Sequence, residues 1–299
     1  MLEIKLILCP IDFSEFSERA YQLALSVAEH YQAKLVAQHV VEVWRHPSAS
    51  FAASGGLYEE FRQALRETGE EQLQQFAKNH THGEIQPEFV VHEGSAPDSI
   101  LSFAQEQKAD VIVMGSHGRR GFDRLMLGSV TDRVMRMATC PVLAVHKPPH
   151  DSTAAGKEWH YVHHLSRILF CADFSRNSER ALNYAISGTA EYDAELTLLH
   201  VLEEVPNLAK REEAIAAATE QLDKLIPPEV RKTRKIKTAV RIGKPYREII
   251  QFAVEAQTDL VTMGVRGRGA LDRAVFGSTT YRVMQLGPCP VLAVHALNR

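Results

Sequence analysis

The stretch MGSHGRRGFDRLMLGS, from Met114 to Ser129, ends an apolar run, turns through glycines and arginines, and enters a helical pattern. The same construction returns as MGVRGRGALDRAVFGS, from Met263 to Ser278, 149 positions further along the chain. Glycine lacks a Cβ, so Gly115 and Gly118 are expected to take positive φ angles and to let a ligand approach the backbone. The sequence therefore predicts one strand–loop–helix motif that is used twice.

Each copy of this motif is suited to hold an anion. A serine, Ser129 or Ser278, follows the last glycine at the predicted start of a helix, where unpaired N–H groups and the positive end of the helix dipole face the loop. Arginines outnumber acidic residues in both loops: Arg119, Arg120 and Arg124 against Asp123, and Arg266, Arg268 and Arg273 against Asp272. A plain connection with a serine N-cap is the structural alternative, but it would not need to keep the same nine-residue glycine interval twice.

Composition narrows the class of protein. With 299 residues, 45% hydrophobic and 24% charged, the chain is long enough for two globular domains. A net charge of -3 argues against non-specific binding to nucleic acid or to an anionic membrane surface. The beginning MLEIKLILCPID resembles a strand more than a signal peptide, and no apolar run reaches membrane-spanning length. We therefore expect a cytoplasmic protein with neither a nucleic-acid nor a membrane partner.

The cysteines give no sign of a disulfide framework or a metal site. All of them border apolar runs and none shows a CxxC spacing, which favours buried reduced thiols over disulfides or a metal site. They are Cys9, Cys140, Cys171 and Cys289.

Strand and helix patterns alternate along both halves. In the first half, strands are expected over 4–9, 34–41, 85–92, 110–114 and 142–146, and helices over 15–31, 58–79, 94–107 and 128–138, with a loop over 48–56. In the second half, strands are expected over 168–172, 195–200, 235–241, 259–263 and 290–295, and helices over 207–225, 244–256 and 277–285. This alternation predicts two tandem Rossmann-like α/β domains, each an open parallel sheet with helices on both faces.

The domain boundaries follow from the repeat and from composition. A stretch rich in Pro, Gly, Ser and Thr gives a linker over 148–164, between a first domain over 1–147 and a second over 165–299. The histidines in and beside it could suggest a metal, but no acidic or cysteine ligands join them at an established spacing. Asp12 and Asp173 are 161 positions apart, against 149 for the glycine loops, so the second half is 12 residues shorter, in the region of 48–60.

The strand ends carry candidate chemistry. Asp12 and Asp173 follow the first strand of each half, where a carboxylate can accept hydrogen bonds from ribose hydroxyls; an N-cap for the next helix is the alternative. The backbone at Val40 and Val201, at the end of the second strand, can read an adenine edge. Ligands of such folds bind beyond the carboxyl ends of strands where the chain order reverses, so Asp12 and the loop after Met114 are expected to meet there.

Several catalytic signatures are absent. The chain contains no GxxxxGK[ST], GxSxG or HExxH motif, and no GxGxxG follows its first strands. Hydrolysis needs a positioned base and usually a metal, whereas Asp12 and Asp123 are better explained by ribose binding and by pairing with arginines. We expect nucleotide binding with slow turnover at most.

These motifs resemble the universal stress protein family, in the branch with the G-2x-G-9x-G-[ST] nucleotide signature. The likeness extends from the Asp-Phe-Ser after each first strand to the closing Cys-Pro-Val-Leu-Ala-Val-His of each half. It implies five parallel strands per domain, binding of ATP, ADP or AMP with Mg²⁺ as a candidate companion, and a role in stress signalling and not in catalysis. The implied first site is Pro10, Asp12, Val40, Met114, Gly115, Gly118, Arg119, Gly128, Ser129 and Val130. The implied second site is Asp173, Val201, Met263, Gly264, Gly267, Arg268, Gly277, Ser278 and Thr279.

The second half departs from the first at two site positions. Cys171 stands where the first half has Pro10, and Thr279 stands where it has Val130, which bears on the affinity of the second site and not on its existence. Family dimers commonly associate through the last strand, so we expect 142–146 to pair with 291–295 in an intramolecular pseudo-dimer that can pair again into a homodimer. An ATP-cleaving or adenylyl-transferring enzyme and a nucleotide-independent interaction scaffold remain the alternative functions.

Overall fold

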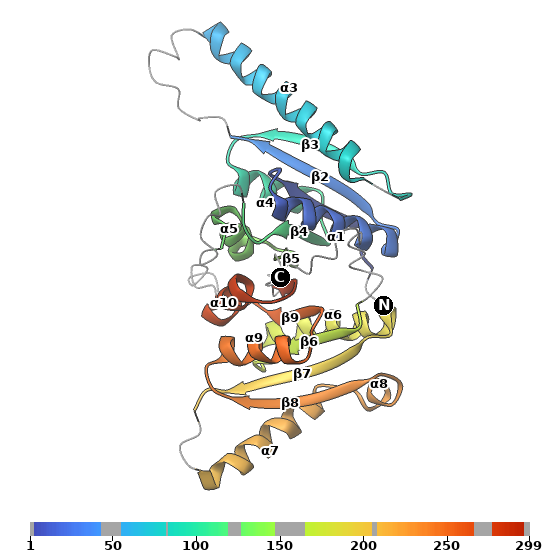
Figure 1. Cartoon of the computed structure of the whole chain (residues 1–299), viewed down its shortest axis with the longest axis vertical. Helices are drawn as coiled ribbons and strands as arrows, with labels where there is room; N and C mark the ends of the chain where they lie inside the picture. Colours follow the sequence, from blue (N-terminus) through green and yellow to red (C-terminus); the bar gives the residue numbers. More distant parts are fainter. Residues whose placement is uncertain are drawn as a thin grey trace.

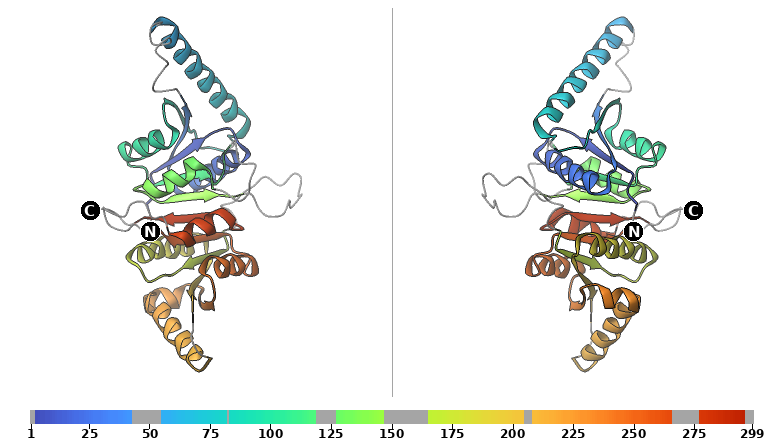
Figure 2. Two further views of the ribbon diagram at one scale, coloured as in Figure 1. Left: turned by 90° about the vertical axis from the view of Figure 1, so that its left-hand side faces the viewer. Right: turned by 90° about the vertical axis from the view of Figure 1, so that its right-hand side faces the viewer.

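Strands from both halves of the chain join in one sheet. The computed structural model describes residues 3–42, 55–81, 83–118, 127–146, 165–204, 208–265 and 277–295. In these residues, ten strands form a continuous sheet in the order β3-β2-β1-β4-β5-β10-β9-β6-β7-β8, with helices on both of its faces (Figures 1 and 2). The predicted pair of tandem Rossmann-like α/β units is confirmed. The loop over 48–56 falls mostly, and the linker over 148–164 entirely, outside the described residues.

The two halves repeat the same order of elements. The first consists of β1 (Leu6–Ile11), α1 (Glu15–Tyr31), β2 (Lys34–Val41), α3 (Gly55–His80), β3 (Glu88–Glu93), α4 (Ala96–Glu106), β4 (Val111–Gly115), α5 (Ser129–Met137) and β5 (Val142–Val145). The second consists of β6 (Arg167–Cys171), α6 (Arg176–Tyr192), β7 (Glu195–Leu202), α7 (Leu208–Lys224), α8 (Pro228–Thr233), β8 (Ile236–Ile242), α9 (Pro245–Glu255), β9 (Leu260–Gly264), α10 (Ser278–Leu286) and β10 (Val291–Val294). The length difference between the halves includes the outer helices, because α3 has 26 residues and α7 has 17.

The junction between the halves is an antiparallel strand pair. Strands are parallel within each half, but β5 and β10 run in opposite directions with Leu143 paired to Leu292. The predicted pairing of the last strands is therefore confirmed. As a result, the carboxyl ends of β4 and β5 point to one edge of the sheet and those of β9 and β10 point to the opposite edge.

The hydrophobic core differs between the two faces of the sheet. On the face covered by α4, α5, α9 and α10, one cluster of buried residues runs without interruption from Leu8 and Ile112 in the first half to Val261 and Val283 in the second. On the other face, α1 and α3 enclose one cluster and α6 and α7 enclose another. The halves are thus fused into a single core on one side of the sheet only.

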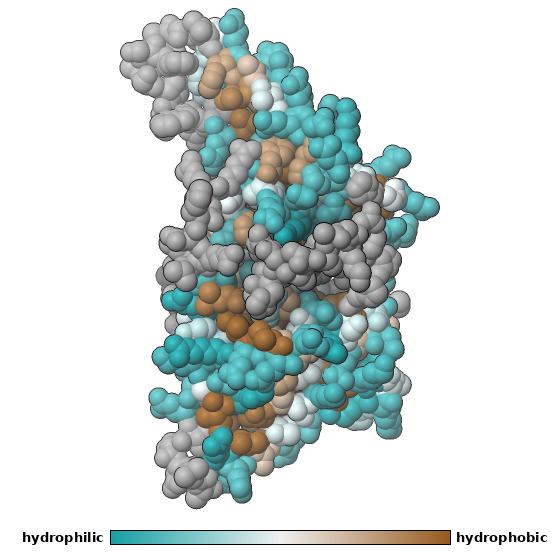
Figure 3. Space-filling model, in the orientation of Figure 1, coloured by the Kyte–Doolittle hydropathy of each residue, from teal (hydrophilic) through white to brown (hydrophobic). Residues whose placement is uncertain are grey.

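Figure 3 shows one face of the molecule. Hydrophilic residues cover most of its described part, and apolar patches lie among them, including over α9 and α10. None of the helices in the described residues is long and apolar enough to cross a membrane, and these residues hold no group of three or more potential metal ligands. All four cysteines are buried and free, as the sequence predicted.

Candidate functional site

The chain order reverses between β1 and β4, and the predicted site lies at this point. β1 has β2 on one side and β4 on the other, so the crossover from β1 to β2 and the later crossover from β3 to β4 run in opposite directions along the sheet. Asp12 directly follows β1, and Gly115 ends β4. A Cβ added at Gly118 would lie 2.8 Å from Asp12 Oδ2, so the carboxylate and the glycine loop meet as predicted. This is the place where open α/β sheets bind ligands.

A short hydrogen-bonded turn fixes Asp12. Its Oδ1 accepts from Ser14 N at 3.0 Å and from Ser14 Oγ at 2.6 Å, and Ser14 Oγ in turn accepts from Ser17 N at 3.2 Å. Ser14 is therefore the N-cap of α1, and the alternative that Asp12 itself caps the helix is wrong. The second half repeats the turn, because Asp173 Oδ1 accepts from Ser175 N at 3.0 Å and Ser175 caps α6.

A left-handed phenylalanine follows each aspartate, and sequence reasoning missed it. Phe13 has φ 62° and Phe174 has φ 57°, a region that non-glycine residues rarely adopt. Each ring packs against a histidine with centroids 4.5 Å apart. The Nδ1 of His39 donates to Ile11 O at 2.8 Å, and the Nδ1 of His200 donates to Ala172 O at 2.8 Å. The strained turn is thus held by the same contacts in both halves, as such backbone strain at a functional site requires.

The glycines of the loop serve a different purpose from the one predicted. The expectation of positive φ at Gly115 and Gly118 is wrong, since the described glycines with positive φ are Gly83, Gly94 and Gly243. Gly115 still belongs to β4, and a Cβ there would lie 2.7 Å from Phe16 Cβ and 2.9 Å from Phe16 C on α1. It is glycine because a helix backbone crosses directly above it. The signal for this was not local, because it depends on where α1 packs.

The N-terminus of α5 faces the loop without a side-chain cap. Gly128 occupies the cap position, and its own N–H donates to Ser116 O at 2.9 Å, so this amide is already used. The first backbone bond of the helix is Asp132 N to Gly128 O at 2.8 Å. The amides of Ser129 and Val130 therefore precede the helical hydrogen-bond ladder and are suited to an anion.

A threonine anchors this helix end to the sheet. Thr131 Oγ1 donates to Gly115 O at 2.8 Å, which ties the first turn of α5 to the end of β4. In the second half Thr280 Oγ1 donates to Gly264 O at 3.4 Å, and Gly277 again caps without a side chain. Ser278 and Thr279 consequently hold the same positions at the start of α10 as Ser129 and Val130 hold on α5.

The end of β2 turns backbone groups toward the site. The ladder between β1 and β2 ends at the pair Ile11 and His39, so Val40 continues past the end of β1. Val41 O accepts from Gly94 N on the β3 side at 3.0 Å. Because neighbouring residues of a strand direct their backbone groups to opposite sides, those of Val40 face the β1 side. Val201 is placed alike, since Leu202 O accepts from Gly243 N at 2.9 Å.

The remaining predicted residues divide into two groups. Met114 and Met263 are buried in the core at 4% and 5% exposure, so only their backbones can contribute, and Pro10 is half-buried within β1. Arg119, Gly267 and Arg268 lie outside the described residues.

Two buried histidines, His117 and His146, follow the ends of β4 and β5. His117 is buried, its Nδ1 is 2.9 Å from Ser116 Oγ, and its ring centroid is 5.1 Å from that of Phe16. Burial, and next the neighbouring His117, lower the pKa of His146 to about 4, and the backbone carbonyl of Cys289 offsets this only in part. His146 is therefore neutral at pH 7.

Comparison with known proteins finds relatives of both halves of the chain. The model of the universal stress protein family matches residues 3–146 and 164–295. A universal stress protein of Methanocaldococcus jannaschii is 37% identical over 144 residues, 48% of this chain and 83% of the relative. A universal stress protein of Mycolicibacterium smegmatis is 26% identical over 96% of both chains. The crystal structure of a universal stress protein from Archaeoglobus fulgidus has a TM-score of 0.69 at 22% identity, covering 98% of this chain and 99% of the other, and so shares the fold.

Proposed function

Because the chain belongs to the universal stress protein family, we propose that it binds ATP, or ADP or AMP in its place, and acts as a stress-response regulator without strong catalysis. The observation that carries this proposal is the meeting of Asp12 with Gly118 beside the uncapped N-terminus of α5. One carboxylate and one row of free amides then lie at a single strand end, where a nucleoside and its phosphates need them.

In the first pocket, each part of the nucleotide has a matching group. Asp12 accepts hydrogen bonds from the ribose hydroxyls, while its Oδ1 is held in place by Ser14. The backbone of Val40 reads the adenine edge. The phosphates lie against the amides of Ser129 and Val130, and Arg119 adds positive charge. Pro10, Met114 and Gly115 shape the wall through their backbones.

Mg²⁺, where it accompanies the nucleotide, is held mainly by the phosphates. The described residues contain no cluster of three potential metal ligands that would bind it alone. Phosphate oxygens are the usual ligands of Mg²⁺ at nucleotide sites, completed by water and one or two carboxylates.

The second pocket uses the corresponding groups. Asp173 takes the ribose and Val201 the adenine, while Ser278 and Thr279 offer the amides of α10. Gly264, Gly267, Gly277, Met263 and Arg268 complete the loop. Cys171 replaces Pro10 here; it is buried, and burial raises its pKa, so it remains a neutral thiol.

We assign these pockets to a first domain over 1–147 and a second over 165–299, joined by the linker over 148–164. The protein acts in the cytoplasm. The β5–β10 junction makes one chain a pseudo-dimer, and two such chains form the candidate homodimer through another surface.

Acid extraction of the purified full chain followed by mass spectrometry tests the ligand. Retained ATP, ADP or AMP supports the proposal, whereas a covalent adenylate or rapid conversion of added ATP favours an enzyme, and absence of nucleotide together with no calorimetric signal from added ATP favours a scaffold.

Calorimetric titration of ATP then assigns the pockets. Gly118→Val places a branched side chain against Asp12 Oδ2 and is expected to remove one of two binding events. Gly56→Val, on α3 where an added Cβ meets no atom within 4 Å, is the matched control and should leave both. Two events that survive Gly118→Val would exclude the first loop as a nucleotide site.

A further inference from the structure

A cavity lies where the two halves fail to merge. On the α1 and α6 face the fully buried clusters of the two halves are separate and are bridged by the partly buried Tyr192 and Leu292, in contrast with the continuous core on the opposite face. Between them the described residues line a partly open cavity of about 110 Å³. No residue of the two proposed nucleotide pockets lines it. The space therefore belongs to the junction and not to either strand-end site.

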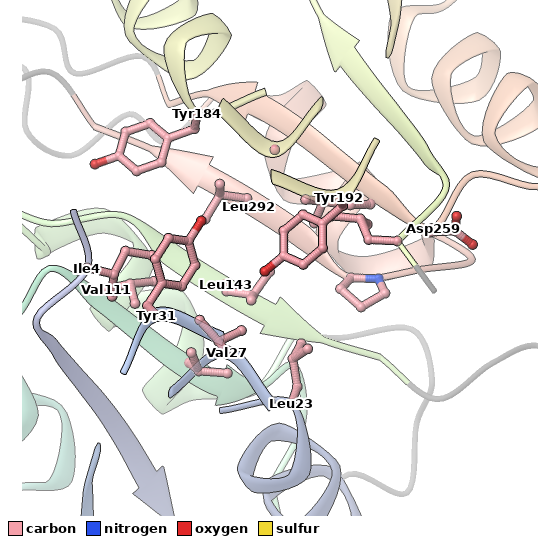
Figure 4. Close-up of a pocket in the computed structure, with 15 residues that line it drawn as sticks. Ile4, Leu23, Val27, Tyr31, Val111, Leu143, Tyr184, Tyr192, Asp259 and Leu292 are labelled. Atoms are coloured by element: carbon pink, nitrogen blue, oxygen red, sulfur yellow. The ribbon is translucent and has the colours of Figure 1, made fainter. Parts of the chain in front are cut away.

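The lining of the cavity repeats across the junction. Leu143 and Leu292 are paired residues of β5 and β10, so the pseudo-two-fold axis that relates the halves passes between them. Figure 4 shows Tyr31 and Tyr192, 161 positions apart, reaching over this leucine pair. One matched position differs greatly in volume, because the first half has Val27 where the second has Gly188. Gly188 lets α6 pack closely on β6, because a Cβ added there would lie 2.8 Å from Ile168 Cδ1.

Two of the polar side chains that line the cavity, Tyr31 and Asp259, already have hydrogen-bond partners. The Tyr31 hydroxyl donates to Glu191 Oε2, and Ser187 Oγ donates to Glu191 Oε1 at 3.0 Å. Asp259 Oδ2 accepts from Ser166 N at 2.9 Å and from Arg167 N at 2.8 Å. Burial raises the pKa values of Tyr31 and of Tyr192, so both remain neutral phenols. What the wall offers to an occupant is mainly aliphatic carbon and aromatic ring surface.

We propose that this cavity binds one small, uncharged, apolar molecule about the size of a single ring. Apolar cavities of about 150 Å³ in proteins bind benzene and xenon, and this cavity has a similar volume and a mainly apolar wall. Because both halves contribute to the wall, the occupant stabilises their association. This proposal does not depend on the proposed nucleotide sites, and its test can fail or succeed whether or not they bind nucleotide.

Benzene and xenon are the probes for the full chain. Crystals under xenon pressure should show a single peak between Leu143 and Leu292. Saturating benzene should raise the unfolding temperature by about 2 °C, the shift expected for a weak ligand that binds only the folded state. The same shift should appear with and without ATP, which separates this test from that of the nucleotide pockets.

Two filling variants provide the control from either half. Leu292→Phe and Leu143→Phe occupy the cavity and should abolish both the xenon peak and the benzene shift. Val254→Phe adds a ring on α9 at a side chain that is 56% exposed, and should keep both. An absent xenon peak in the wild-type crystal, a cavity occupied by the chain's own residues, or a benzene shift that persists in both folded filling variants would overturn the proposal.

Discussion

The two halves keep the same close crossing of a strand and a helix, β4 under α1 and β9 under α6, but surround it with different side chains. In the first half, Gly115 lies under Phe16, whose ring packs against His117. In the second, Gly264 lies under Asn177, whose Nδ2 donates to Val265 O. An aromatic contact in one copy is thus replaced by a hydrogen bond in the other. This difference teaches that the geometry of the site depends on the close crossing of the strand and the helix. Glycine permits that crossing in both halves, whereas the surrounding side chains can differ.

Replacing Gly115 or Gly264, the glycines at which a strand crosses a helix, by alanine should have the largest effect on stability. In Gly264→Ala the new Cβ would lie 2.6 Å from Asn177 C and from Ser178 N, and in Gly115→Ala 2.7 Å from Phe16 Cβ. Because backbone cannot move aside cheaply, each variant should lose about 3 kcal/mol of unfolding free energy in urea titrations. Gly277→Ala, with its nearest atom at 3.7 Å, is the control. Equal losses in all three variants would show that the crossing is not the constraint.

Lowering the pH should affect stability differently through His146 and His295, the histidines that follow the last strand of each half. Burial lowers the pKa of His146 to about 4, below the unfolded value of 6.5, so its neutral form contributes stability that is complete above pH 6.5 and lost as the pH falls toward 4. The loss should total about 3 kcal/mol. Burial also lowers the pKa of His295, but a hydrogen bond to Met135 O at 2.6 Å opposes this.

Urea titrations between pH 7 and pH 4 check this difference. His146→Gln should flatten the pH dependence more than His295→Gln does. The reverse ranking would contradict the assignment.

Removing the charge of Asp12 or Asp173 should show whether the two proposed pockets bind ATP separately. Asp12→Asn and Asp173→Asn retain an oxygen for the serine turn but lose the charged acceptor, so each should weaken ATP binding at its own site by about 30-fold. Calorimetry of each variant measures which of two affinities falls. If either substitution weakened both sites equally, the pockets would be coupled and not separate.

The contact at the ends of α1 and α6 should have the smallest effect. His30 in the first half corresponds to Glu191 in the second, and His30 Nε2 lies 4.0 Å from Glu191 Oε2. Tyr31→Phe removes the hydroxyl that donates to Glu191 and should cost about 1 kcal/mol of unfolding free energy. Tyr58→Phe, on α3, is the matched control. An unchanged stability in Tyr31→Phe would show that this contact does not contribute to the junction.

Much of the fold could be predicted because local signals and tertiary packing agree. The predicted helix over 15–31 and strand over 34–41 coincide with α1 and β2. The first strand was expected to stop before Pro10, yet β1 continues to Ile11. Proline is tolerated there because β4 pairs only with Ile7 and Leu8, so no ladder partner on that side needs its missing N–H. The six-residue helix α8 was missed, because it buries no residue and therefore has no apolar periodicity.

The candidate site was predictable in its groups but not in its geometry. The repeat and the fold rule placed Asp12 beside the glycine loop. The left-handed Phe13 has no local signature, since only the packing of His39 and Phe76 around its ring explains it. The purpose of Gly115 was misread for the same reason, because the atom that excludes a Cβ belongs to α1.

The reversed direction of β10 against β5 has a consequence for signalling. The two candidate sites lie at opposite edges of the sheet, because β5 and β10 run in opposite directions. Under the proposed function, a single flat partner could therefore not contact both nucleotides of one chain at once.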